Sequence, residues 1–183
     1  MINIQVKIGV RSLIKAIESF LSEQVEAEFE GKTYSGLFPL VMVGFSLLLG
    51  FYLLAHQMGS TGFFTTAFNT LEMLLLYGSL IFWIVTNILQ LLLGRRNLLT
   101  LFELFGGLIF IFSIVWLFVT FPFDFTYFAD VAPDFLRFLV QWIDNNIARV
   151  LMVLLIVLSL IMEVWSATLH VFYRKALVKK LIA

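Results

Sequence analysis

Long stretches of this chain contain no Asp, Glu, Lys or Arg, and they predict where it crosses a membrane. No such residue occurs at Thr33–Leu71, Met73–Gly94 or Leu104–Phe123, and a fourth apolar run, Val150–Tyr173, is interrupted only by Glu163. An α-helix rises about 1.5 Å per residue, so about 20 apolar residues cross the hydrocarbon core of a bilayer. The pattern predicts an all-α integral membrane protein with four transmembrane helices, at about 37–57, 72–94, 103–122 and 149–172.

Two segments outside these stretches have helical patterns of their own. Over residues 9–24, apolar positions recur every three or four residues with charged positions between them, which predicts an amphipathic helix on the membrane surface. Residues 2–8 alternate apolar and polar side chains, so a short strand is an alternative there. Pro133 is well placed to begin a helix, and the apolar side chains after it predict an outer interfacial helix at about 133–146.

The basic residues are distributed unequally between the two sides of the predicted spans. Ten of the twelve lie in the N-terminal segment, the link between the second and third spans, or the C-terminal tail; the other two are Arg137 and Arg149. Because cytoplasmic loops are enriched in Lys and Arg, we expect both termini to be cytoplasmic, in the plasma (inner) membrane. The chain then divides into a cytoplasmic amphipathic segment (1–35), a four-helix transmembrane domain (36–173) and a basic cytoplasmic tail (174–183).

Composition narrows the function classes mainly by exclusion. The chain is 61% hydrophobic and 13% charged, whereas soluble domains carry about 25% charged residues. The formal net charge is zero, which gives no basic surface for nucleic acid. There is no cysteine, so disulfides and thiolate chemistry are excluded. No catalytic or nucleotide-binding motif occurs, and we expect no enzyme activity, no cofactor and no bound metal.

One acidic residue lies inside a predicted span. A charge at the centre of a spanning helix is disfavoured by about 2.5–3.5 kcal/mol on insertion scales, and such residues are usually functional. Glu163 shares one face of its helix with Ser159, Ser166 and His170, and the second span has a matching polar stripe. We therefore predict an intramembrane site that binds a proton or a cation, formed by Asn87, Gln90, Glu163 and His170.

This polar site has a simpler alternative and a geometric difficulty. Glu163 can instead form a hydrogen bond between helices, or reach water at the headgroups. In a bundle whose helices follow one another around a ring, the second and fourth helices are diagonal to each other. Direct contact between the two polar stripes would then need a different helix order or a neighbouring subunit.

Small and capping residues predict further local features. Ser46 and Gly50 lie four residues apart in the first span, and Gly106 and Gly107 lie in the third; small residues let helices approach closely in lipid. They serve either packing within the monomer or a homo-oligomer interface. Asn69 or Thr70 is expected to cap the second span, with Glu72 in its first turn. The acidic residues on the outer side are expected to form a solvated rim, with a divalent-ion site as the alternative: Asp124, Asp130, Asp134 and Asp144.

Two function classes follow from these features. The first is a non-catalytic membrane subunit or scaffold in the lipid bilayer, which associates with itself or with other membrane subunits. The aromatic residues at the outer end suit docking in that interpretation: Phe118, Phe121, Phe123, Phe125, Tyr127 and Phe128. The alternative is an oligomeric ion channel, or a proton- or cation-coupled transporter, with a path past Glu163 and Asn87.

Overall fold

The computed structural model describes residues 15, 19, 20, 23, 37–93 and 96–182, with side chains described outside 93–101 and 173–182. The amphipathic helix predicted at 9–24, the alternative strand at 2–8 and the N-terminal segment 1–35 lie outside the described residues. Only the four isolated positions Lys15, Ser19, Phe20 and Glu23 are described there, and all four are helical.

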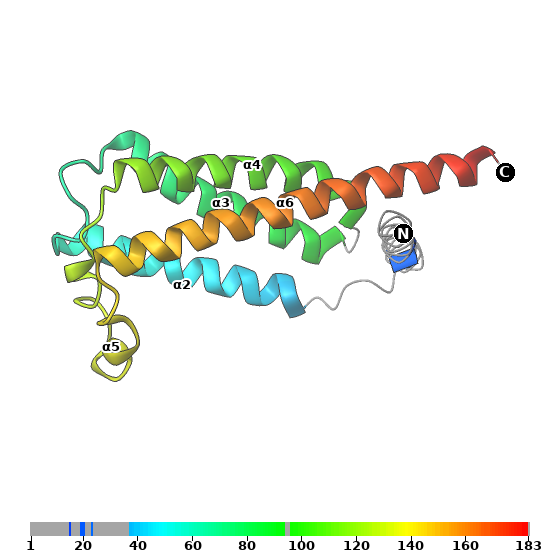
Figure 1. Cartoon of the computed structure of the whole chain (residues 1–183). Coiled ribbons are helices and arrows are strands. Elements are labelled where there is room, and N and C mark those ends of the chain that lie inside the picture. Colours follow the sequence, from blue (N-terminus) through cyan, green and yellow to red (C-terminus); the bar gives the residue numbers. More distant parts are fainter. Residues whose placement is uncertain (1–14, 16–18, 21–22, 24–36, 94–95, 183) are drawn as a thin grey trace, which may run out of the picture.

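Four long helices make up most of the described chain, and they run back and forth along one direction (Figure 1). They are α2 (Leu37–Gly59), α3 (Thr70–Leu93), α4 (Arg96–Thr120) and α6 (Asn145–Ile182). Each contains a stretch long and apolar enough to cross a membrane. Two short elements, the 3-10 helix η1 (Phe125–Tyr127) and helix α5 (Asp134–Val140), lie between α4 and α6. The prediction of an all-helical chain with four membrane-length helices is confirmed for the described residues.

Several helix boundaries differ from the sequence prediction. The helix predicted at 133–146 ends at Val140, because the Asp144 carboxylate accepts hydrogen bonds from the N–H groups of Asn146 (2.9 Å) and Ile147 (2.8 Å) and so caps α6. The last helix therefore begins at Asn145 rather than 149, and it continues to Ile182 instead of ending near 172. Helix α4 begins at Arg96, seven residues before the predicted start, and ends at Thr120 rather than 122.

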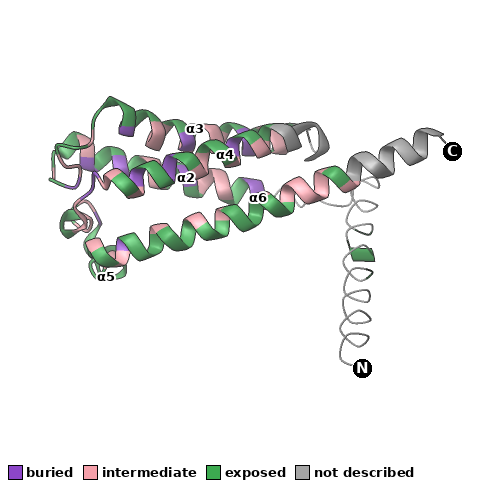
Figure 2. Ribbon diagram, turned by 45° about the horizontal axis from the view of Figure 1, so that its top comes forward, coloured by how far each residue is buried: buried purple, intermediate pink, exposed green. Residues whose placement is uncertain are grey.

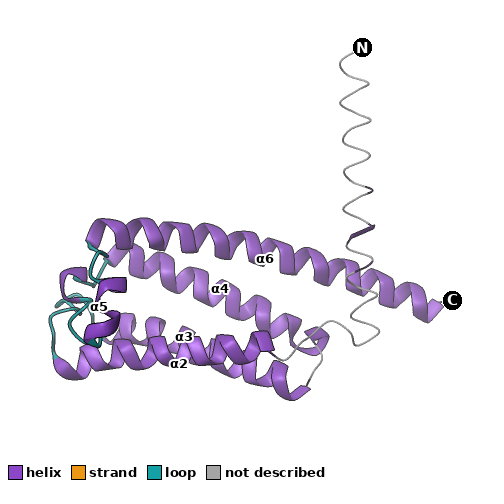
Figure 3. Ribbon diagram, turned by 90° about the horizontal axis from the view of Figure 1, so that it is seen from below, coloured by secondary structure: helices purple, strands orange, loops and turns teal. Residues whose placement is uncertain are grey.

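The four helices pack in chain order. Among the described residues, extensive contact joins α2 to α3, α3 to α4, and α4 to α6. Seen from below, α4 lies between α3 and α6, and α6 lies apart from α2 (Figure 3). The arrangement is therefore an open row, in which α2 and α6 form the two edges. Between Arg149 and Trp165, most positions of helix α6 are exposed (Figure 2).

A buried hydrophobic cluster lies at one end of the helices, in and beneath a cap made by residues 60–69 and 121–133. Phe63 is 1% exposed and Phe123 is 7% exposed. Phe64 and Phe123 form an isolated antiparallel bridge, and the N–H of Asp124 donates to the Phe63 carbonyl at 2.7 Å. The rings of Phe125 and Phe128 contact the ring of Phe63, and the ring of Phe121 stacks on that of Phe125. Phe123 is thus buried, whereas Tyr127 is 42% exposed, and the docking role of this aromatic end stays a prediction.

His56 joins the cap to α2. It is 1% exposed, its Nε2 lies 3.1 Å from the carbonyl of Phe128, and its Nδ1 lies 2.7 Å from the hydroxyl of Thr61. Because a carbonyl only accepts, Nε2 carries the hydrogen and donates it. A neutral ring then accepts the Thr61 hydroxyl at Nδ1. The Tyr52 hydroxyl donates to the same Phe128 carbonyl, so α2 holds the cap at two points.

The start of α3 confirms the predicted N-cap and identifies it as Asn69. The Asn69 side chain accepts from the N–H of Leu71 at 2.9 Å, and the Glu72 carboxylate accepts from the N–H of Asn69 at 3.2 Å. These reciprocal bonds form a capping box. Glu72 is only 2% exposed, and its other oxygen accepts from the indole N–H of Trp116 at 3.0 Å. This contact ties α3 to α4 beside the cap.

Asp124 connects the cap to the beginning of α6. Its carboxylate accepts from the hydroxyl (2.7 Å) and the N–H (3.1 Å) of Thr126, and from the Asn145 amide (3.3 Å). The Thr126 hydroxyl is the main reason that the pKa of Asp124 is lowered, because these donors stabilise the charged form. The Asn145 side chain in turn accepts from the N–H of Phe125 at 2.7 Å.

Candidate functional site

The polar stripe of α6 faces the rest of the protein. Between Ala148 and Ser166, the less exposed positions are Met152, Ile156, Ser159 and Glu163, and the residues between them are exposed. Intervals of three and four residues define one narrow face of a helix. Since α4 is the helix that α6 packs against, the polar stripe lies in the contact between these two helices.

Glu163 is placed by a glycine of α4. A methyl group at Gly107 would overlap the Glu163 carboxyl, so the carboxyl occupies the space that any other residue at 107 would fill. Gly106 plays the same part on the other side of α4, where a methyl group would overlap the ring of Phe82 from α3. The two predicted packing glycines therefore contact two different helices.

A second carboxyl lies next to Glu163. Glu103 is one helical turn before Gly107 on α4, and it interacts electrostatically with Glu163. The Gln90 side chain of α3 donates a hydrogen bond to the Glu103 carboxylate. Polar side chains from three helices therefore follow one another in the order Gln90, Glu103, Glu163. We call these three residues, with His170, the polar cluster.

Glu103 is absent from the predicted site because it lies at the predicted beginning of the third span, next to the charge-free stretch and not within it. The signal was its spacing from Gly107, since the two are four residues apart and share a helix face. Glu103 also explains how polar side chains of α3 and α6 are connected although these two helices are not neighbours. Because α4 lies between them, Gln90 reaches the α6 carboxyl through Glu103 rather than directly.

Two atoms of the polar cluster have no partner. Among the described side chains, Glu163 Oε1 and His170 Nδ1 are buried and form no hydrogen bond. A buried polar atom without a partner is costly, and in a native structure it calls for a proton, an ion, a water or a partner group. His170 lies two turns beyond Glu163, farther from the cap.

Asn87 does not join this cluster. It is 4% exposed, and its amide donates to the carbonyl of Trp83 in its own helix at 2.8 Å. Ser79, also on this stripe, likewise bonds to carbonyls of its own helix. Of the four predicted site residues, the structure places Gln90 and Glu163 around Glu103. His170 lies on the same face of α6, and Asn87 is bonded within its own helix.

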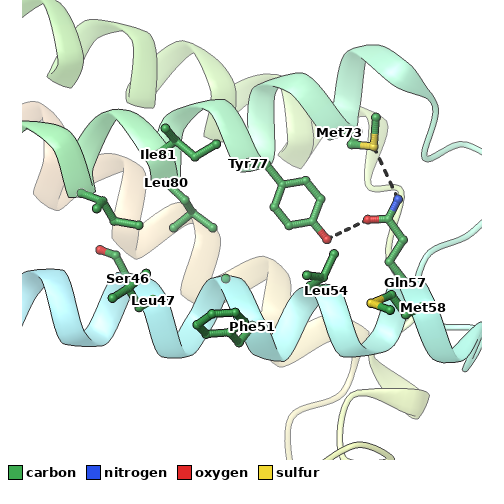
Figure 4. Close-up of a pocket in the computed structure, with 12 residues that line it drawn as sticks. Ser46, Leu47, Phe51, Leu54, Gln57, Met58, Met73, Tyr77, Leu80 and Ile81 are labelled. Carbon is green, nitrogen blue, oxygen red and sulfur yellow. Dashed lines mark hydrogen bonds between the residues drawn. The ribbon is translucent and has the colours of Figure 1, made fainter.

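The remaining small residues line a groove between α2 and α3 (Figure 4). The groove has a volume of about 490 Å³, and both Ser46 and Gly50 lie along it. A methyl group at Gly50 would meet nothing within 4 Å, so α2 has open space at this point. Near the cap, the hydroxyl of Tyr77 donates to the Gln57 side chain at 2.8 Å and gives the groove a polar end.

Three of the four acidic residues predicted on the outer side have structural partners. Asp124 and Asp144 cap η1 and α6, and Asp134 lies 3.8 Å from Arg137 in an exposed pair one turn apart. Within the described part of the chain, no three His, Cys, Asp or Glu residues are grouped closely enough to hold a metal ion.

Comparisons with known proteins add no family. No family model, no curated protein and no solved structure matches this chain. Its class is defined by its own geometry, which is that of a helical membrane protein with four candidate membrane-spanning helices.

Proposed function

We propose that this chain is a non-catalytic integral membrane component that works in an assembly, with further copies of itself or with other membrane subunits. Its termini lie on the cytoplasmic side of the plasma (inner) membrane in this proposal, because ten of the twelve basic residues lie on that side of the four spans.

The observation that carries the proposal is the open row of helices. Only 6% of the apolar part of α6 is buried within the chain, compared with 17% for α2 and 22% for α4. Helix α6 is held along one narrow face, and that face includes the two buried atoms without partners. Helices in lipid associate through close packing and hydrogen bonds between side chains. A neighbouring helix at either edge of the row would add both.

The α2 edge supports the same proposal. Gly50 has open space in front of it, and Ser46 lies one turn away in the same groove. Ser46 is itself only 4% exposed, so Gly50 is the small residue that permits close approach of a second helix. Self-association through α2 is therefore the form of assembly that we propose first.

Replacing Gly50 by Leu is expected to break this assembly. The Leu side chain would extend into the groove and hold the partner helix away, and its Cβ would meet no heavy atom of the monomer within 4 Å. We expect the parent protein in mild detergent to have the mass of an oligomer and the Gly50→Leu variant to have the mass of a monomer, as measured by light scattering.

The matched control is Gly44→Leu. Gly44 also has open space around it, but it does not line the groove, so this variant should keep the mass of the parent. A parent protein that is monomeric in lipid nanodiscs, with no bound subunit, would refute the proposal, as would equal dissociation of the two Gly→Leu variants.

A second candidate function is a conduit for protons or cations. The observation in its favour is that polar side chains of three helices, Gln90, Glu103 and Glu163, follow one another at one depth, with His170 two turns farther along α6. Intramembrane carboxyls of this kind commonly mark ion paths and proton relays. Because a single row of four helices encloses little space, conduction would require the oligomer.

Glu163→Gln tests the conduit. Glutamine keeps the size of the side chain but cannot release a proton, so pH-dependent flux in proteoliposomes should be abolished while the oligomer remains. The control Asn87→Ala changes a buried polar residue outside the polar cluster and should leave flux unchanged. Absence of flux in the parent protein would reject this function and leave the first proposal standing.

A further inference from the structure

Two glutamates within the candidate spans have opposite surroundings: Glu72, which is 2% exposed, and Glu163, which is partly buried. Glu72 accepts two hydrogen bonds, from the Trp116 indole at 3.0 Å and from the N–H of Asn69 at 3.2 Å. Such donors stabilise a carboxylate. Glu163 differs, because its buried Oε1 has no hydrogen-bond partner among the described residues and because another glutamate, Glu103, interacts with it electrostatically. The donors that stabilise an ionised glutamate are therefore present at Glu72, whereas the buried Oε1 of Glu163 has none among the described residues.

The depth of Glu163 is set by both helices that form its site. Glu163 lies 18 residues after the start of α6 and Glu103 lies 17 residues before the end of α4, so each is about 26–27 Å from the cap along its helix. The hydrocarbon core of a bilayer is about 30 Å thick. The pair thus lies near the far margin of the core, on the side away from the cap.

From this placement we propose that Glu163 and Glu103 form a proton-binding site, in which one proton is held by the two carboxyls and exchanges with the solution on the side away from the cap. Two carboxylates that share a desolvated site cannot both remain ionised, so the pair retains a proton. The cation that satisfies Glu163 is then a proton, which needs no third ligand, in keeping with the lack of a metal-sized group among the described residues.

The surrounding groups define how the proton is held and where it goes. On α4, Gly107 provides the space for the Glu163 carboxyl, and Glu103 is the ionisable group that faces it. On α3, Gln90 donates to Glu103 and does not titrate, so it favours the charge on Glu103 and the proton on Glu163. On α6 itself, His170 lies two turns nearer the aqueous side, and its Nδ1 has no hydrogen-bond partner among the described residues.

This inference deepens the conduit but does not depend on transport, because a site can bind a proton without passing it across the membrane. The test is therefore a measurement of protonation and not of flux. A protonated carboxyl has a C=O stretching band that is separate from the bands of carboxylates. Infrared difference spectra of the full chain in liposomes, parent minus variant, can assign that band to a residue.

We expect Glu163→Gln to remove a protonated-carboxyl band at neutral pH, and Glu72→Gln to remove carboxylate bands only. We expect Glu103→Gln to keep the Glu163 band but to move its disappearance to lower pH, because the neighbouring negative charge has been removed. If Glu163→Gln removes no protonated-carboxyl band, the proposal is wrong. If Glu103→Gln leaves the pH dependence of the band unchanged, the proton does not belong to the pair.

Gly107→Ala provides a variant that alters no titratable group. The added methyl group displaces the Glu163 carboxyl from its place on α4, and a flexible carboxyl can move away at little steric cost. We expect the band to shift and to lose its response to Glu103→Gln while the helical circular dichroism is unchanged. An unshifted band would contradict the assigned geometry. A band present in a protein without flux would retain this site and reject only the conduit.

Discussion

Replacing Phe63 by Ala is expected to lower the free energy of unfolding by about 3–5 kcal/mol, which is the range for truncating a buried aromatic side chain. Phe63 is 1% exposed, and it lies at the centre of the cap, with the rings of His56, Phe123, Phe125 and Phe128 around it. The cavity left by the ring cannot collapse easily, because the backbone of Phe63 is held by its bond to Asp124. Reversible unfolding in mixed micelles, followed by far-ultraviolet circular dichroism, measures the change.

The matched control for Phe63 is the same substitution on α5. Phe135 is 73% exposed, so Phe135→Ala should change the free energy of unfolding by no more than about 0.5 kcal/mol. Equal losses in the two variants would show that the cap does not hold the helices together at that end. The interpretation of the aromatic residues as an internal core would then fail.

The second large effect is expected at the contact between Glu72 and Trp116. Trp116→Phe removes the indole N–H that donates to Glu72, and a hydrogen bond to a charged group contributes about 1.5–3 kcal/mol. Unfolding under the same conditions provides the measurement.

A double-mutant cycle separates this hydrogen bond from the loss of ring volume. In the Glu72→Gln background, Trp116→Phe should lower the free energy of unfolding by about 1 kcal/mol less than in the parent. The reason is that the carboxylate that accepts the indole hydrogen bond has been replaced by a neutral amide. Trp142→Phe is the matched control, because that indole is 57% exposed and donates to a backbone carbonyl. Additive effects of the Glu72 and Trp116 substitutions would exclude the coupling.

The features that can be predicted from the sequence are those that depend on neighbouring residues along the chain. The four spans follow from the absence of charge over about 20 residues, because hydrocarbon rejects ionised side chains wherever they lie in the fold. The cap of α3 is equally local, since Asn69 and Glu72 satisfy N–H groups within three residues of each other. The face of α6 that carries Glu163 also follows from helical spacing alone.

The composition of the polar cluster could not be predicted in the same way. Glu103 belongs to it, and Asn87 does not, because α4 packs between α3 and α6. Asn87 lies on the predicted polar face of its helix, but its amide donates to the Trp83 carbonyl of the same helix. Helical spacing alone does not predict this hydrogen bond. The end of α5 at Val140 was decided by Asp144, whose side chain serves the next helix instead.

The sequence by itself therefore determined how many times this chain can cross a bilayer and which faces of its helices are polar, because both depend on local periodicity and on the exclusion of charge. Only the tertiary structure decided which helices are neighbours, since that order depends on where the glycines of α4 admit Phe82 on one side and Glu163 on the other. The pairing of Glu163 with Glu103 is a consequence of that order, because it joins two residues 60 positions apart that no local pattern connects.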